Sequence, residues 1–272
     1  MEARRLPFRR TLIIVLSRTR RRSVLVVSAW LLLSESTAGA ELQERTARAY
    51  QSYRDGAQTR FLTRPRKPGG PSAGGIIGRP AAEDGIISIA GGLIHHWTGA
   101  VFIPNVTLPT ALDVSRNYVG YPSIYKEIVR SRVLEHDGDK YWILLRLKEG
   151  EAGITAVLDV RSRVRYEFPD ASHAFVFSES DEIREVRRAG ATDEILLPPG
   201  RDSGYLWRTD VFTAFIQTAD GVYIEMETLG LSRPFPPMLG WIIEPIARRF
   251  GQRSIVQSLD QFRTAVLAGQ KR

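Results

Sequence analysis

Two carboxylates on one strand of the C-terminal third are the best candidates for acid–base chemistry in this sequence. Glu225 and Glu227 are separated by one residue, so they share a face if the segment is a strand. Arg208 belongs to the preceding strand of the same predicted hairpin. Paired carboxylates can act as acid and base when their surroundings separate their pKa values. The alternative is a solvated outer sheet face, because the alternating positions of this strand are apolar.

The adjacent histidines His95 and His96 suggest metal binding, and they lie in a stretch with the pattern of a strand covered on both sides. Neighbouring residues of a strand point to opposite faces, so the two imidazoles cannot easily share one metal ion. The chain has four histidines and no cysteine, and no third ligand stands at metal-binding spacing. We therefore expect packing or hydrogen-bonding roles for this pair, and neither a metal nor a cofactor.

A basic strip is predicted on another strand, where Arg161, Arg163 and Arg165 alternate. It could meet lipid headgroups in a peripheral membrane contact. The wet face of an antiparallel strand is the simpler interpretation.

Aromatic residues along the chain could line a pocket for an apolar molecule, or could equally fill a core. With the hairpin residues they make up the predicted ligand-binding set, which is Trp97, Tyr125, Tyr166, Trp207, Arg208, Glu225 and Glu227. No catalytic residue is predicted. The sequence contains no P-loop, nucleophile-elbow, zinc-protease or dinucleotide-binding motif.

The positive charge of the chain is concentrated at its N-terminus. The 272 residues carry a net charge of +8, but residues 1–40 hold eight arginines against two glutamates. The remainder has 30 basic and 28 acidic residues, so a nucleic-acid partner loses its main support. The absence of cysteine excludes disulfides and thiolate nucleophiles.

Residues 1–40 have the three parts of an export signal. An arginine-rich stretch, 1–22, precedes an apolar run, 23–33, that is short for a membrane span. Ala38 and Ala40 then supply the small residues that a signal peptidase recognises. The sequence predicts a secreted or periplasmic protein cleaved after Ala40. An uncleaved N-terminal membrane anchor is the alternative, because an earlier apolar patch adds length.

The rest of the chain divides into three parts. Residues 41–63 predict a polar, marginally stable helix. Residues 64–84 are rich in Pro and Gly and predict a disordered linker. Residues 85–272 predict one α+β domain: a strand, two short helices, about six antiparallel strands and a long C-terminal helix with an apolar stripe. No β-α-β alternation appears, so a parallel nucleotide-binding sheet is not expected.

Five short stretches within this domain carry a resemblance to a known family. They are His-His-Trp-Thr-Gly at 95–99, Tyr-Pro-Ser-Ile-Tyr at 121–125, Gly-Tyr-Leu-Trp-Arg at 204–208, Gly-Val-Tyr-Ile-Glu at 221–225 and Leu-Gly-Leu-Ser-Arg at 229–233. They resemble the START-like superfamily, also called SRPBCC or helix-grip, and a bacterial secreted group within it. The resemblance spans roughly residues 85–269. It implies a curved antiparallel sheet wrapped around the C-terminal helix, with two short helices after the first strand.

That superfamily includes lipid carriers, cyclases and ligand receptors and shares no catalytic motif, so the resemblance assigns no catalytic role. We predict an exported, non-catalytic domain that binds or transfers an apolar or amphipathic small molecule, such as a lipid. The ligand would occupy a cavity between the sheet and the C-terminal helix. Two alternatives remain open. One is a cyclase- or hydrolase-type enzyme using pocket carboxylates, and the other is an envelope-associated interaction module.

Overall fold

The computed structural model describes residues 40–66, 75–82, 84–151, 154–236, 238 and 240–269, with side chains omitted at 151 and 154. The predicted export signal therefore lies outside the described residues, except for Ala40. All described residues belong to one compact unit, Ala38–Arg272, which contains its own hydrophobic cores. Among them, no helix combines the length and the apolar character needed to cross a membrane.

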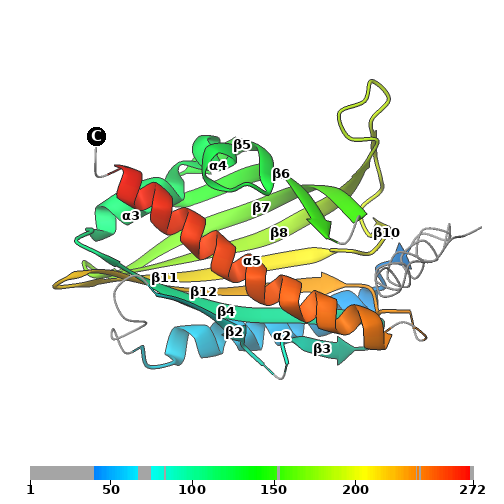
Figure 1. Ribbon diagram of the computed structural model, residues 1–272, viewed down its shortest axis with the longest axis horizontal. Coiled ribbons are helices and arrows are strands. Elements are labelled where there is room, and N and C mark those ends of the chain that lie inside the picture. The colour runs from blue at the N-terminus through cyan, green and yellow to red at the C-terminus, as the bar shows by residue number, and fades with distance from the viewer. Residues whose placement is uncertain are drawn as a thin grey trace, which may run out of the picture. The chain divides into compact units, whose positions relative to one another are not determined.

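Ten strands form one antiparallel sheet (Figure 1). Its order is β2 (Ile76–Pro80), β4 (Gly92–Pro104), β12 (Gly221–Ser232), β11 (Arg208–Thr218), β8 (His173–Arg187), β7 (Ile154–Asp170), β6 (Lys140–Glu151) and β5 (Ile128–Asp137). In addition, β3 (Ile86–Ile89) pairs with β4, and β9 (Ile195–Leu196) pairs with β8. A separate short ladder joins β1 (Ala40–Glu41) to β10 (Arg201–Asp202).

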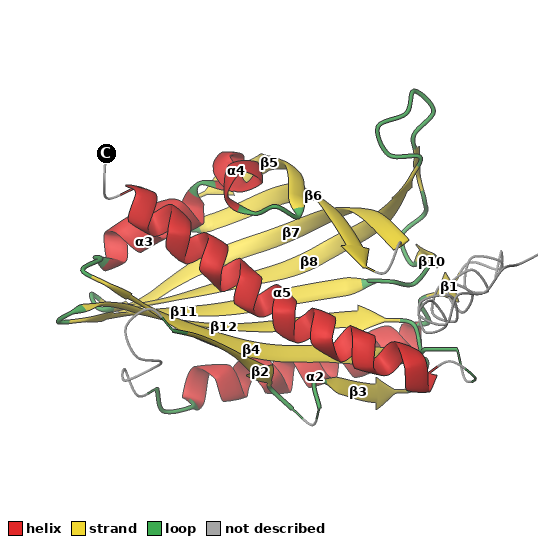
Figure 2. Ribbon diagram, in the orientation of Figure 1, coloured by secondary structure: helices red, strands yellow, loops and turns green. Residues whose placement is uncertain are grey.

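The C-terminal helix α5 (Gly240–Gly269) lies across one face of this sheet, which we call the inner face (Figure 2). Its buried stripe packs mainly on β4 and β2 and consists of Ile243, Ile255, Leu259, Phe262 and Val266. Three short helices follow β4 and complete this layer: α3 (Leu108–Arg116), η1 (Tyr118–Gly120) and α4 (Tyr121–Ile124). The predicted helix-grip architecture is confirmed.

Glycines allow α5 to approach the sheet closely. A Cβ atom on Gly251 would lie 2.2 Å from Trp97 Nε1, and one on Gly78 would lie 2.5 Å from a methyl carbon of Val256. On β4, a Cβ atom on Gly99 would lie 2.8 Å from Leu259. Real Cβ contacts are not this short, so the contact between α5 and the β2–β4 edge depends on these glycines.

The opposite, outer face of the sheet is covered by α2 (Glu44–Thr63), as Figures 1 and 2 show. Its buried side chains include Tyr50, Ala57 and Phe61, which join a second core. The sheet contributes the rest of this core, in part Ile94, Phe177, Phe212, Ala214, Leu229 and Leu231. The helix that the sequence presents as polar and marginally stable is therefore an integral layer of the fold.

Residues 76–80 differ from their prediction, since they were placed in the disordered linker but form β2 at the sheet edge. Ile76 pairs with Val101 and Gly78 with Gly99, both on β4. The low side-chain bulk that suggested disorder is what lets α5 pack over this edge. The folded part thus begins before residue 85, while residues 67–74 and 83 of the predicted linker lie outside the described residues.

Candidate ligand-binding site

The seven predicted ligand-binding residues do not share one site. Trp97, Tyr125 and Tyr166 pack in the inner-face core. Trp207 belongs to the outer-face core. The remaining three, Arg208, Glu225 and Glu227, lie on the outer face, because they occupy the same alternate positions of β11 and β12 as the residues of the outer-face core. Only the first three can contribute to a site between the sheet and α5.

The two candidate carboxylates are held by arginines that follow α2. Arg64 pairs with Glu225 and lies 2.7 Å from Glu227, and Arg66 lies 3.2 Å from Glu225. Glu227 also accepts a 2.6 Å hydrogen bond from His96 Nε2. Burial alone would raise the pKa of Glu227, but the hydrogen bond and charge of His96 and the charge of Arg64 outweigh it, so its pKa is lowered.

The surroundings of Glu225 and Glu227 match neither interpretation made from the sequence. The two carboxylates are not exposed on a solvated sheet face, and they do not form an acid–base pair in a pocket. Glu227 is 3% exposed and its oxygens point toward α2 and its C-terminal extension, away from the inner face. Its ion pairs fasten the C-terminal end of α2 to β12.

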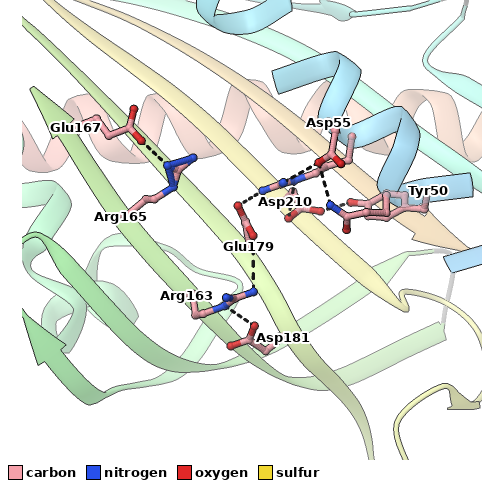
Figure 3. A network of polar contacts seen from close by, with 10 residues as sticks. Tyr50, Asp55, Arg163, Arg165, Glu167, Glu179, Asp181 and Asp210 are labelled. Atoms are coloured by element: carbon pink, nitrogen blue, oxygen red, sulfur yellow. Dashed lines mark hydrogen bonds and ion pairs between the residues drawn. The ribbon is translucent and has the colours of Figure 1, made fainter. Parts of the chain in front are cut away.

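A second polar network fastens the middle of α2 to β8 and β11 (Figure 3). Arg54 is a buried residue of α2. It pairs with Glu179 and lies 3.7 Å from Asp210. The hydroxyl of Tyr50 donates to Asp210. Burial raises the pKa of Asp210, although Tyr50 and Arg54 partly offset this effect.

The predicted basic strip continues this network. Arg163 lies 2.6 Å from Asp181 and Arg165 pairs with Glu167, so both are balanced by carboxylates (Figure 3). Arg161 is exposed and forms no ion pair with a described carboxylate.

The two adjacent histidines have separate partners, as expected. His96 lies between Tyr53 and Glu227 on the outer face, whereas His95 Nε2 lies 2.8 Å from Ser232 Oγ. Burial lowers the pKa of His95 to about 4. No group of three potential ligands within the described part of the chain could hold a metal ion.

Tyr125 and Tyr166 belong to a cluster of five tyrosines where the short helices meet the inner face: Tyr118, Tyr121, Tyr125, Tyr141 and Tyr166. Successive ring centroids are 5.0 to 5.8 Å apart.

Three hydroxyl groups of this tyrosine cluster have hydrogen-bond partners. Tyr118 Oη and Tyr166 Oη are 2.8 Å apart, and Tyr121 donates to the backbone carbonyl of Ser115. Burial, with the neighbouring phenols, raises the pKa of Tyr118 and of Tyr121, which keeps both neutral. The 118-121-125 spacing was a usable signal, because residues three and four apart share a helix face.

A strip of the inner face remains partly exposed although it is central in the sheet. Val211, Ser178 and Thr228 are half-buried neighbours in register on β11, β8 and β12. On the outer face of β8 and β11, the adjacent residues Phe177 and Phe212 are 0% exposed. The inner surface of these strands is thus covered less completely than the outer one.

A pocket of about 280 Å³ lies between the middle of α5 and the β5–β6 edge. Its lining combines Phe250 with polar and charged side chains, including Lys126, Glu127, Ser254 and Gln257. Such a lining suits the polar end of a ligand whose body lies under α5.

No family model matches the chain, and no curated protein matches its sequence. Several solved structures are similar to it. The STAR-related lipid transfer protein from Xanthomonas axonopodis has 14% identity and a TM-score of 0.43, over 66% of this chain and 97% of that one. Human STARD10 has 11% identity and a TM-score of 0.43, over 87% and 84%. The Zhui aromatase/cyclase from a Streptomyces species has 12% identity and a TM-score of 0.43, over 64% and 93%. Similarity at this level does not assign a function to the chain.

Proposed function

We propose that this protein binds an amphipathic small molecule between the inner face of the sheet and α5. One observation carries the proposal. On the outer face of β8 and β11, Phe177 and Phe212 are fully buried beneath α2. The inner-face residues beside them, Ser178 and Val211, stay partly exposed. Burying apolar surface there would yield about 25 cal/mol per Å².

The inner face offers such a ligand apolar contacts on both sides of the exposed strip. The main core, with Trp97 and the tyrosine cluster, lies on one side. A smaller apolar cluster of Leu158, Val160 and Ile183 lies on the other. The pocket beside Phe250 gives the polar end of the molecule a place near solvent.

The proposal is tested by native purification followed by solvent extraction and mass spectrometry, together with titration of the amphipathic dye 1-anilinonaphthalene-8-sulfonate. We expect a co-purifying amphiphile and dye binding that Val211→Trp abolishes, because the larger side chain fills the strip. Ile195→Trp, at an exposed position on β9, is the matched control. If Val211→Trp leaves dye binding intact, the inner face is not the binding site.

Both alternative functions have less support than ligand binding. A cyclase- or hydrolase-type enzyme would use Glu225, Glu227 or a histidine, and the two glutamates are paired with arginines on the outer face. An interaction module would dock to its partner through the polar N-terminal helix, and the apolar side of that helix, α2, packs on its own sheet.

We also propose that the protein is exported, with Glu41 as the first residue after cleavage. The support is the sequence of residues 1–40 alone. N-terminal sequencing of the protein recovered from its native host tests this: a chain beginning at Glu41 is the expected result, and a chain retaining residues 1–40 would favour the anchor.

A further inference from the structure

We propose that five hydroxyl groups on the inner face select the ligand, favouring an apolar skeleton that carries several neutral oxygen groups over a plain hydrocarbon chain. This inference rests on the proposed function and specifies its ligand class. The five residues, which we call the hydroxyl belt, are Ser162, Ser178, Thr209, Thr213 and Thr228.

The register places the hydroxyl belt on four consecutive strands. Thr228 on β12 is opposite Val211 on β11, and Val211 is opposite Ser178 on β8. Ser178 is opposite Val164 on β7, and Ser162 occupies the neighbouring inner-face position on that same strand. Neighbouring strands are about 4.8 Å apart, so the belt spans about 14 Å across the sheet. This is the scale of a multi-ring molecule.

The hydroxyl groups of the belt have no partners of their own. None of the five forms a hydrogen bond with another group in the described part of the chain, although Ser162 is only 3% exposed and Thr213 only 7%. The adjacent Ser180 differs, because its Oγ accepts a 2.8 Å hydrogen bond from the Thr209 backbone. None of the five oxygen atoms is fully buried without a partner, so each keeps contact with solvent and is open to a ligand.

The hydroxyl belt separates two apolar regions of the inner face. Along β7, Val160 belongs to the smaller cluster and Val164 to the main core, with Ser162 between them. A ligand that covers both regions must cross the belt. A plain acyl chain would remove water from the hydroxyls without replacing their hydrogen bonds, which is unfavourable for each group left unsatisfied.

The belt is uncharged, which narrows the ligand further. The charged residues next to the belt, Glu179, Asp210 and Glu227, lie on the outer face and are paired there. Neutral hydroxyl and carbonyl oxygens therefore fit the belt better than phosphate or carboxylate groups, which prefer charge-assisted partners.

Two matched pairs of probes test this inference: quercetin against flavone, and cholate against 5β-cholanate. Each pair shares a skeleton and differs in its hydroxyl groups. Binding is measured by calorimetry to the chain starting at Ala40, which retains every described helix and strand. We expect the hydroxylated member of at least one pair to bind about tenfold more tightly.

The variant T213V/T228V removes two hydroxyls of the belt while keeping side-chain shape. It should reduce that preference by about tenfold and leave the binding of flavone and cholanate unchanged or tighter. T59V/T63V, on the exposed side of α2, is the matched control and should bind like the parent chain. Thermal melting of both variants verifies that they are folded.

The outcomes separate the two proposals. If the unhydroxylated probes bind and T213V/T228V weakens both members of a pair equally, the hydroxyl belt does not select, and the proposed function stands. If none of the four probes binds and the dye titration also fails, the proposed function and the belt are both wrong.

Discussion

The two faces of the sheet are built from the same strands but are covered in opposite ways. On the outer face, α2 seals an aromatic core, and Arg54, Arg64 and Arg66 neutralise the carboxylates beneath it. On the inner face, α5 packs tightly only along the β2–β4 edge and leaves a strip of small side chains partly exposed. The charged residues of the outer face thus hold α2 on the sheet, whereas the neutral side chains of the inner face remain available to bind a ligand.

The difference shows that charged residues in a mainly apolar sheet do not by themselves mark an active site. Buried ion pairs contribute little net stability but are costly to break, and they can fix which helix docks where. The contrast between the two faces makes four predictions, from the largest effect to the smallest.

The first concerns the seat of α2. Phe61 is 0% exposed and contacts the rings of Phe175, Phe177 and Phe212. Phe61→Ala should lower the free energy of unfolding by about 3–5 kcal/mol, because it leaves a cavity in the outer core. Denaturant unfolding measures this. Leu62→Ala, at a position 39% exposed, should cost much less, and equal costs would mean that α2 does not seal this face.

The second concerns the ion pairs of the outer face. Glu227→Gln should cost about 2–3 kcal/mol at neutral pH, because it leaves Arg64 and His96 without their carboxylate. The pKa of Glu227 is lowered in the folded chain, so its stabilisation is present above the unfolded pKa and is lost as pH falls through the folded pKa.

The difference in the free energy of unfolding between the parent protein and Glu227→Gln should therefore disappear at acidic pH. Denaturant unfolding at a series of pH values measures it. Glu135→Gln, at an exposed position without an ion pair in the described chain, should behave like the parent throughout. A gap that stays constant in acid would contradict the electrostatic explanation.

The third concerns the close contact of α5 with the inner face. Gly251→Ala would bring a methyl group against Trp97 and should cost about 1–3 kcal/mol through overpacking. Gly240→Ala, at the start of the same helix with nothing near its Cβ, should be neutral or slightly stabilising. Thermal unfolding of the two variants compares them directly, and a stable Gly251→Ala protein would mean that α5 does not rest on Trp97.

The fourth concerns His95. Its pKa is lowered to about 4 by burial, so between its unfolded and folded pKa values only the unfolded chain takes up the proton. The free energy of unfolding should therefore fall by about 2 kcal/mol as pH drops from about 6.5 to about 5. His95→Asn should remove this part of the pH dependence, whereas His136→Asn, at an exposed hairpin, should retain it.

The element order was predictable from the sequence because it depends on local patterns. Alternation defined the strands, and the apolar stripe of α5 defined the last helix. The role of α2 was not predictable, because the segment is polar on most sides, whereas the structure buries Tyr50, Arg54 and Phe61 along one side of it. A buried arginine has no signature in an apolar pattern, since its partners Glu179 and Asp210 are far along the chain.

The site could be predicted only in part for the same reason. Trp97, Tyr125 and Tyr166 are on the inner face, as a pocket requires. For Glu225 and Glu227, the sequence predicts that they share a face of β12 but not which element covers that face. The hydroxyl belt was not predictable, because five isolated Ser and Thr residues become a surface only when four strands are aligned.

The position of α2 also dictates an order of events during folding. The Tyr50–Asp210 contact joins residues separated by 160 positions, and such non-local contacts form slowly. The helix emerges early in synthesis, but the strands that it covers, β8, β11 and β12, are all made after residue 172. Closure of the outer face is therefore a late step. Before α2 docks, Phe177, Phe212 and Leu229 have no cover on this face, and exposed apolar surface of this kind is prone to aggregation.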